Sequence, residues 1–387
     1  MPVDHARQAS SRLRPGPFVA AVAAGAAVVL SSPFMAELRN ALKDAFPARF
    51  PSGLGGLVAA AGAAAVLVAL VRIRERHAPR YLAVGAAVAA AALYARTVAT
   101  GNADVDAVER VHFVQYGIVT LLFYRAWRPL DDGSLLLLPA LCALVVGTAD
   151  EALQWFVPVR VGELHDVLID AVAIVCGVSF AAGLDPPRHG LLRMREGSVS
   201  RLGAATGATL LVVAGFIDVV HLGYLVRDDR IGAFRSRQTK EALAAAAQQR
   251  AAQWRLRPPL TLRRLSREDQ YVAEALWHVE RRNEAWEAGD VVSARRENEI
   301  LDAYYGPVLD TPSYVSPTGH RWAARQRAEA AARAPLDAPP YVSLAERSAI
   351  FLWPKAPFRI GALLASCAIL ILCRRLDRAR GATPAAP

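Results

Sequence analysis

The residues best suited to chemistry lie between positions 112 and 170, where polar side chains interrupt long apolar runs. They include imidazole, phenol, carboxylate, amide and guanidinium groups, which together could exchange protons or bind a charged ligand. Ionisable groups inside apolar segments are costly and usually face the protein interior, so the set predicts one shared polar pocket. The candidate pocket residues are His112, Tyr116, Glu151, Gln154, Arg160, Asp166 and Asp170.

The spacing of these residues indicates that helices present them. Glu151 and Gln154 are separated by three positions and Asp166 and Asp170 by four, so each pair shares one face of a helix. Asp166 also stands at an expected helix start, where unpaired backbone amides and the helix dipole favour a carboxylate. Three helix ends would therefore bring the polar groups to one side of a membrane.

The elements that carry these residues are long apolar stretches, and eight of them could cross a membrane as helices. The predicted fold class is therefore all-α: a polytopic transmembrane bundle of about eight spans, with an extracytoplasmic helical domain inserted before the last span. A cleaved signal peptide is the competing interpretation of the first stretch, although Ser31, Ser32 and Pro33 supply no clean cleavage site. The predicted spans cover residues 18–36, 53–71, 81–99, 111–127, 134–149, 166–184, 202–226 and 356–373.

The orientation follows from the Lys and Arg residues of the short loops. These residues concentrate on the side that holds the N-terminus, so both termini are predicted to be cytoplasmic. The predicted parts are two N-terminal spans (1–80), a four-helix core (81–184), a seventh span (185–226), the extracytoplasmic domain (227–347), and a last span with a basic tail (348–387).

The segment 227–347 changes abruptly to charged, Ala-rich and Gln-rich sequence. Helices are expected over 239–254, 271–286, 291–305 and 322–333, and a turn at Gly289 would join the second to the third. The segment could cover the membrane core or bind a protein partner.

Composition excludes several classes of function. The net charge of +10 could suit nucleic acid, but most basic residues flank the apolar runs, where membrane topology explains them. All four cysteines lie inside apolar runs, so the charged segment has neither a disulfide framework nor a paired-cysteine zinc site. No cofactor or resident metal is expected.

The most specific motifs in the chain are His112-Phe-x-x-Tyr116, then Glu151-x-x-Gln154-x-Phe156-x-Pro158-x-Arg160, then Asp166 before a helix that contains Gly177. This pattern, over about residues 81–184, resembles the VanZ-like family of small polytopic bacterial membrane proteins. That family is named for a protein associated with teicoplanin resistance, and many of its members have no assigned activity. The resemblance implies the inner membrane of a bacterium and a role in the cell envelope or in antibiotic resistance.

Two positions depart from the family pattern. The family commonly has a basic residue shortly before the histidine, where this chain has Glu109 and Arg110. Asp170 stands where the family commonly has asparagine. The additional carboxylate would either raise a pKa by like-charge repulsion or need a counter-ion, for which Arg160 is the nearest candidate in the sequence.

Four interpretations of the polar group remain open. It could be a buried ion-pair network that holds three helices in register. It could also bind an anionic or amphipathic envelope molecule, such as a lipid-linked glycan precursor, a glycopeptide or a lipid headgroup of the surrounding membrane. An enzyme would use Glu151 or Asp166 as general base, but no hydrolase or metal motif supports it. A transporter is the fourth interpretation: Asp218 and His221, separated by three positions in the seventh span, could join the pocket or relay protons, or could lie near the outer end within reach of headgroups and Arg227.

Overall fold

The computed structural model describes residues 15–73, 77–157, 160, 162–188, 190, 193–259, 269–313, 316–333, 341–346 and 349–382. The chain forms two compact units. The first unit comprises Met1–Gln154, Gly162–Phe216 and Arg359–Pro387, and the second comprises Trp155–Val161 and Ile217–Phe358.

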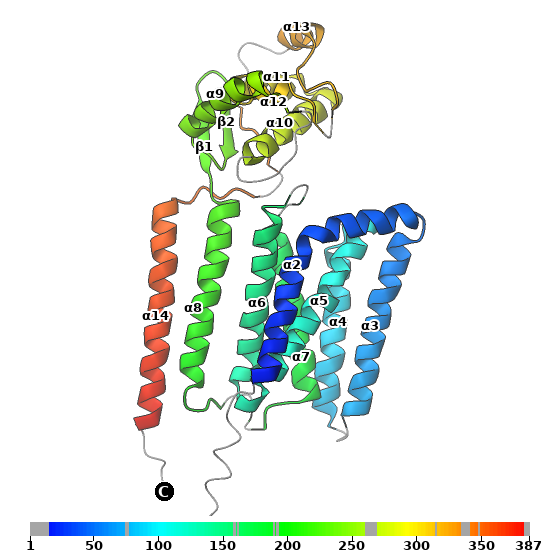
Figure 1. The fold of residues 1–387 in the computed structure, drawn as a ribbon, viewed down its shortest axis with the longest axis vertical. Coiled ribbons are helices and arrows are strands. Elements are labelled where there is room, and N and C mark those ends of the chain that lie inside the picture. The colour runs from blue at the N-terminus through cyan, green and yellow to red at the C-terminus, as the bar shows by residue number, and fades with distance from the viewer. Residues whose placement is uncertain are drawn as a thin grey trace, which may run out of the picture. The chain divides into compact units, whose positions relative to one another are not determined.

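The first unit is a bundle of long helices (Figure 1). Pro33 lies inside α2, which changes direction along its length, because proline removes a backbone hydrogen bond and bends a helix. The helices are α2 (Pro15–Ala45), α3 (Phe50–Arg72), α4 (Ala78–Thr97), α5 (Ala103–Trp127), α6 (Ser134–Gln154), α7 (Leu164–Leu184), α8 (Ser198–Phe216) and α14 (Lys355–Ala382), the last of which enters this unit at Arg359.

Seven helices in the described part of the chain are long and apolar enough to cross a membrane, one fewer than predicted. The exception is α5, whose first turns carry several charged residues and lower its hydropathy. Residues 111–127 are helical as expected, but α5 packs against α2, α3, α6 and α7, so its polar side chains have protein neighbours. The seven are α2, α3, α4, α6, α7, α14 and the continuous helical segment Ser198–His221.

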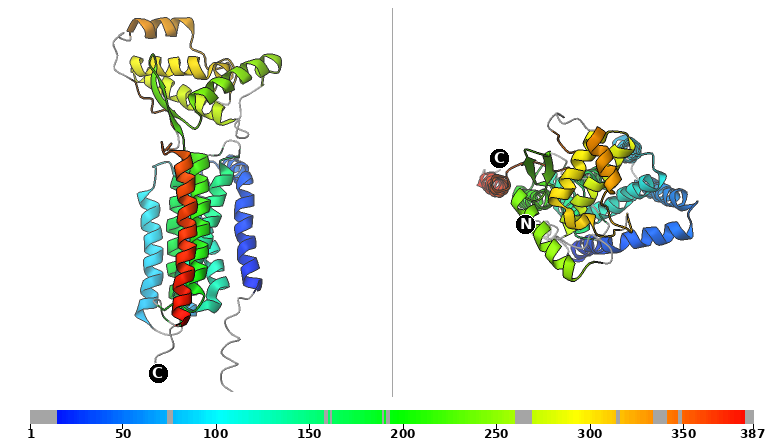
Figure 2. Two further views of the ribbon diagram at one scale, coloured as in Figure 1. Left: turned by 90° about the vertical axis from the view of Figure 1, so that its left-hand side faces the viewer. Right: turned by 90° about the horizontal axis from the view of Figure 1, so that it is seen from above.

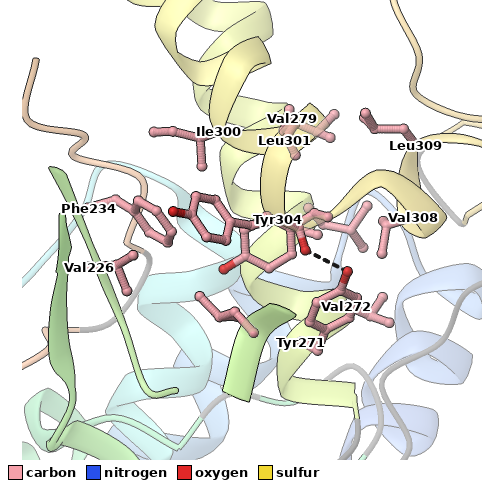
Figure 3. Packing of buried hydrophobic residues seen from close by; sticks show 14 residues of the cluster. Val226, Phe234, Tyr271, Val272, Val279, Ile300, Leu301, Tyr304, Val308 and Leu309 are labelled. Atoms are coloured by element: carbon pink, nitrogen blue, oxygen red, sulfur yellow. Dashed lines mark hydrogen bonds between the residues drawn. The ribbon is translucent and has the colours of Figure 1, made fainter. Parts of the chain in front are cut away.

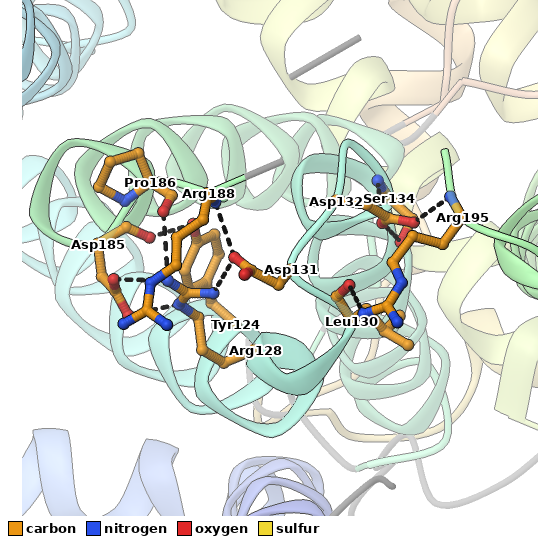
Figure 4. A network of polar contacts seen from close by, with 10 residues as sticks. All are labelled: Tyr124, Arg128, Leu130, Asp131, Asp132, Ser134, Asp185, Pro186, Arg188 and Arg195. Carbon is orange, nitrogen blue, oxygen red and sulfur yellow. Dashed lines mark hydrogen bonds and ion pairs between the residues drawn. The ribbon is translucent and has the colours of Figure 1, made fainter. Parts of the chain in front are cut away.

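Polar contacts tie together one end of α5, α6, α7 and α8 (Figure 4). Arg128, directly after α5, donates through Nη2 to Asp185 Oδ1 at 2.8 Å, just beyond the end of α7. Asp132, directly before α6, accepts from the Arg195 amide at 2.7 Å and from the Ser198 hydroxyl at 2.6 Å. Since α5 and α7 end here and α6 begins here, the candidate pocket residues lie toward the opposite ends of these three helices.

The second unit contains a β-hairpin that the all-helical prediction missed (Figure 2). After α8 the chain forms a short π-helix at Ile217–His221. Then β1 (Tyr224–Asp228) pairs antiparallel with β2 (Gly232–Ser236), with Tyr224 opposite Ser236. The prediction of a span through residue 226 is therefore wrong at its end. Gly232 has a φ of +126°, and a Cβ there would lie 2.3 Å from the Tyr341 carbonyl oxygen, so only glycine fits this turn.

The helices of this unit agree with the expected segments. Gly289, with a φ of +79°, makes the predicted turn between the second and third helices. Thr239 caps the first helix by accepting from the Ala242 amide at 3.2 Å, and Asp290 caps the third through the Ser293 amide. The helices are α9 (Lys240–Leu256), α10 (Asp269–Glu287), α11 (Val291–Tyr304), α12 (Gly306–Leu309) and α13 (Ala324–Arg333).

The core of the second unit forms where the hairpin meets α10 and α11 (Figure 3). Val226 and Phe234 are opposite each other in the hairpin and both are buried. The Phe234 ring packs edge-on against Tyr304, with 5.2 Å between ring centroids. Tyr271 of α10 donates from its hydroxyl to the Tyr304 carbonyl at 2.7 Å, so this large aromatic core keeps its polar atoms satisfied.

Candidate functional site

Helix α5 presents the first two pocket residues on one face. Asn102 caps the helix by accepting from the Asp104 amide at 3.1 Å and the Val105 amide at 3.4 Å. His112 and Tyr116 lie one turn apart, and their rings stack with 5.9 Å between centroids. Both rings turn toward α6 and α7, where their hydrogen-bond partners lie.

The partner of His112 is Asp170 of α7. Nδ1 of the imidazole lies 2.7 Å from Oδ1 of Asp170, and the carboxylate is completely buried. The imidazole and the carboxyl group thus share one hydrogen bond. His112 is therefore a partner of Asp170, and the expectation that Arg160 serves as its counter-ion stays a prediction.

Helix α6 adds a connected group of three polar residues. The Tyr116 hydroxyl donates to Asp150 Oδ2 at 3.2 Å. Gln154 donates from one amide nitrogen to the same Asp150 oxygen at 3.1 Å and to Glu151 Oε1 at 2.7 Å. The other oxygen of Glu151 accepts from the Glu163 amide at 3.3 Å, just before α7 begins. All three side chains of α6 are at least 96% buried.

These contacts form two hydrogen-bonded groups that meet where the His112 and Tyr116 rings stack, and they contain five of the seven predicted pocket residues. The two groups together are called the buried cluster: His112, Tyr116, Glu151, Gln154 and Asp170, together with Asp150. It is linked by side chains from three helices that are remote in sequence. Its base is closely packed, because a Cβ added at Gly147 would lie 2.8 Å from Asp170 Oδ2.

A more accessible acidic rim lies beside the buried cluster. Glu109 stands three positions before His112 on α5 and is within electrostatic reach of His165 and Asp166 at the start of α7. Asp166 is half-buried and His165 is exposed. Glu109 Oε2 is itself buried and accepts no hydrogen bond from the described residues. Glu109 was not among the predicted site residues, although its spacing from His112 places it near the same helix face.

Arg160 lies in the second unit, whereas Glu151 and Asp166 lie in the first. Its expected bridge between these two carboxylates therefore stays a prediction. Pro158 of the motif lies outside the described residues. Of the two neighbouring aromatic residues in the motif, Trp155 is buried and Phe156 is 40% exposed. The Arg237 guanidinium stacks on the Trp155 ring, 4.6 Å from its centroid.

The secondary candidates Asp218 and His221 lie in the short π-helix Ile217–His221, which begins the main segment of the second unit. His221 is buried and donates from Nδ1 to the Ala349 carbonyl at 2.8 Å, and its own carbonyl accepts from the Phe351 amide at 2.6 Å. These contacts attach the chain before α14 to the chain after α8. They support a structural role for His221, and the proposed proton relay stays a prediction.

The charges of the site point to the ligand chemistry it suits. Asp150, Glu151 and Asp170 bring three buried carboxyl groups together with a single imidazole, and the rim adds Glu109 and Asp166. Such a group favours ligands that donate hydrogen bonds. In the described part of the chain, no three His, Cys, Asp or Glu side chains are arranged to hold a metal ion.

Comparison of the chain with family models, with curated proteins and with solved structures finds no match. The resemblance to the VanZ-like family therefore rests on the residues themselves and stays a prediction.

Proposed function

We propose that this chain is a VanZ-like protein of the bacterial inner membrane whose acidic rim binds the sugar portion of a lipid-linked envelope precursor. The observation that carries the proposal is Glu109 Oε2, a buried carboxylate oxygen with no donor among the described residues. Buried polar atoms are nearly always hydrogen-bonded, so such an oxygen fits a ligand that supplies hydroxyl groups. Sugars carry several.

The buried cluster would hold this rim in place. His112 fixes the face of α5 that carries Glu109, and Glu151 accepts from the Glu163 amide close to Asp166. Since the polar links join three helices, a small change at their base would displace rim residues on two of them. Preorganised side chains lower the cost of binding because less freedom is lost when the ligand arrives.

The proposed orientation requires an even number of crossings, because both termini are predicted on the cytoplasmic side. Seven described helices meet the requirement for a span, so α5 would be the eighth. Its surroundings support this role: α2, α3, α6 and α7 pack around it, and a polar helix is tolerated in a membrane when protein surrounds it. The rim would then face the outside, where envelope glycans are assembled.

Binding of a polyprenyl diphosphate sugar tests the proposal, with the sugar-free polyprenyl diphosphate as the comparison ligand. The purified full-length protein should prefer the sugar-bearing lipid, and Glu109→Gln should reduce that preference about ten-fold at unchanged melting temperature, because one charge-assisted hydrogen bond contributes roughly 1.5 kcal/mol. Asp44→Asn, at an exposed acid of α2, is the matched control and should bind like the parent. Equal binding of both lipids by the parent, or an unchanged preference in Glu109→Gln, would reject the proposal.

A second candidate function is purely structural, and the burial of the cluster favours it. Glu151 and Asp170 are fully buried, and neither would touch a ligand at the rim. If glycopeptide susceptibility of cells carrying Glu109→Gln, Asp166→Asn and Asp170→Asn follows melting temperature alone, the cluster is a helix lock and the chain has no sugar site.

A further inference from the structure

A large apolar cavity lies on the other side of α5, between α3, α4, α5 and α7 of the first unit. Its volume is about 820 Å³, within the range of roughly 300–1,000 Å³ typical of small-molecule sites. Alanine and glycine line α3 and α4 here, and a Cβ added at Gly62 or Gly117 would meet no atom within 4 Å. The space exists because these side chains are too small to fill it.

The two faces of α5 separate this cavity from the candidate site. Arg110, Gly117 and Leu121 recur at spacings of seven and four and line the cavity. His112 follows Arg110 by two positions, which is about 200° around a helix, so it points the opposite way. The cavity therefore shares a helix with the buried cluster but none of its side chains.

The cavity has a charged end and a closed apolar end. Arg96, at the last turn of α4, and Arg110, near the start of α5, are its only charged lining residues. Residues 98–102 join these two helices, so both guanidinium groups lie toward the same end of the bundle. Toward the other end, Phe180, Val84 and Ile73 belong to one buried apolar cluster, and Arg80 donates to the Gly183 carbonyl at 3.0 Å where α7 finishes.

Neither arginine has a close polar partner among the described residues, although the charge of Arg110 acts on Asp106, one turn earlier on α5. Arg96 is exposed and Arg110 half-buried, and neither forms a hydrogen bond or ion pair of standard geometry with a described residue. Arg110 lies seven residues into α5, about 10 Å along the axis, whereas Arg96 is one residue from the end of α4. The two arginines thus start at different depths along the bundle axis. Their long side chains can extend along the helix surface, so both could reach one phosphate from different sides.

We propose that this cavity binds one anionic glycerophospholipid, with an acyl chain between α3, α4, α5 and α7 and the phosphate at Arg96 and Arg110. Charge complementarity selects the occupant: an apolar cavity alone accepts any lipid chain, but two guanidinium groups at its mouth favour a headgroup with net negative charge. The site is separate from the sugar site proposed above and does not depend on it.

Lipid titration followed by native mass spectrometry tests the proposal on the delipidated full-length protein. The probes are phosphatidylglycerol and phosphatidylcholine with identical acyl chains. The parent should bind the first phosphatidylglycerol at least ten-fold more tightly than phosphatidylcholine. Arg96→Gln and Arg110→Gln should each reduce that preference about five-fold, and together they should remove it, since a basic residue at a membrane surface contributes roughly that factor.

Matched variants separate the site from general effects on the protein. Arg39→Gln, at an exposed arginine of α2 outside the cavity, should keep the preference, and Arg110→Lys should keep most of it because the charge remains. Gly62→Phe should weaken binding of both lipids by filling the cavity, whereas Gly56→Phe, outside the lining, should not. Equal binding of the two lipids by the parent, a preference that survives in the double arginine variant, or normal binding by Gly62→Phe would each overturn the proposal. None of these results bears on sugar-lipid binding at Glu109.

Discussion

Gly147 of α6 is the position at which the buried cluster is most sensitive to a single added carbon. A Cβ there would lie 2.8 Å from Asp170 Oδ2 and 3.3 Å from Tyr116 Cε1, where ordinary contacts begin near 3.4 Å. The Asp170 side chain is completely buried, and its other oxygen forms a 2.7 Å hydrogen bond with His112. Rotating Asp170 away would therefore break that hydrogen bond. Gly147→Ala must therefore strain or break the cluster.

The expected size of the effect follows from three contributions. Overpacking a well-packed interior costs about 1–3 kcal/mol, and a weakened charged hydrogen bond costs roughly 1.5–3 kcal/mol. Alanine recovers about 1 kcal/mol through its higher helix propensity. Gly147→Ala should therefore lower the free energy of unfolding by about 1.5–5 kcal/mol. At Gly85 of α4 an added Cβ meets nothing within 4 Å, so Gly85→Ala should be neutral or slightly stabilising.

Unfolding in detergent, followed by circular dichroism, measures both variants under the same conditions. The double variant Gly147→Ala with Asp170→Ala adds a sharper test, because shortening Asp170 removes the atom that the new carbon would strike. The double variant should be no less stable than Asp170→Ala alone, so the two changes should be strongly non-additive. If Gly147→Ala is as stable as Gly85→Ala, or if the two changes add, the packing argument is wrong.

Three further predictions concern the second unit and the orientation. A reporter that is active only in the cytoplasm should be silent when fused at Gly289, and activity there would reverse the proposed topology. Arg237→Lys should speed hydrogen exchange around Trp155, because it removes a stacking contact of roughly 0.5–2 kcal/mol; unchanged exchange would show that stacking does not hold this loop. Burial, and then the charge of Arg282, lower the pKa of His320 below its usual 6.5. The unfolded chain therefore takes up the proton more readily than the folded chain, and the second unit should lose stability as the pH falls below that value. Hydrogen exchange of residues 316–322 between pH 7 and 5 should show this loss, and His320→Gln should flatten it; an equal slope in the variant would exclude His320 as the cause.

Local sequence accounts for the helices of both units. Apolar length determined α3, α4, α6, α7 and α14, because a run of about twenty apolar residues has few other stable arrangements. Thr239 and Asp290 cap helices that were expected to begin there, since a cap acts on amides two or three positions away, whereas α5, capped by Asn102, begins eight residues before the predicted span. The hairpin was less visible, because its turn depends on Gly232 lying against the distant Tyr341.

The same distinction applies to the candidate site. Residue type and helical spacing alone identified His112, Glu151 and Asp170 as members of one polar group, because ionisable residues in apolar helices turn toward protein. Only the tertiary structure decided which groups pair: Asp170 is 58 positions from His112 in the chain, and their contact depends on how α5 and α7 pack. The cavity beside Arg110 likewise exists only once four helices assemble, because no single segment encodes the space left between small side chains.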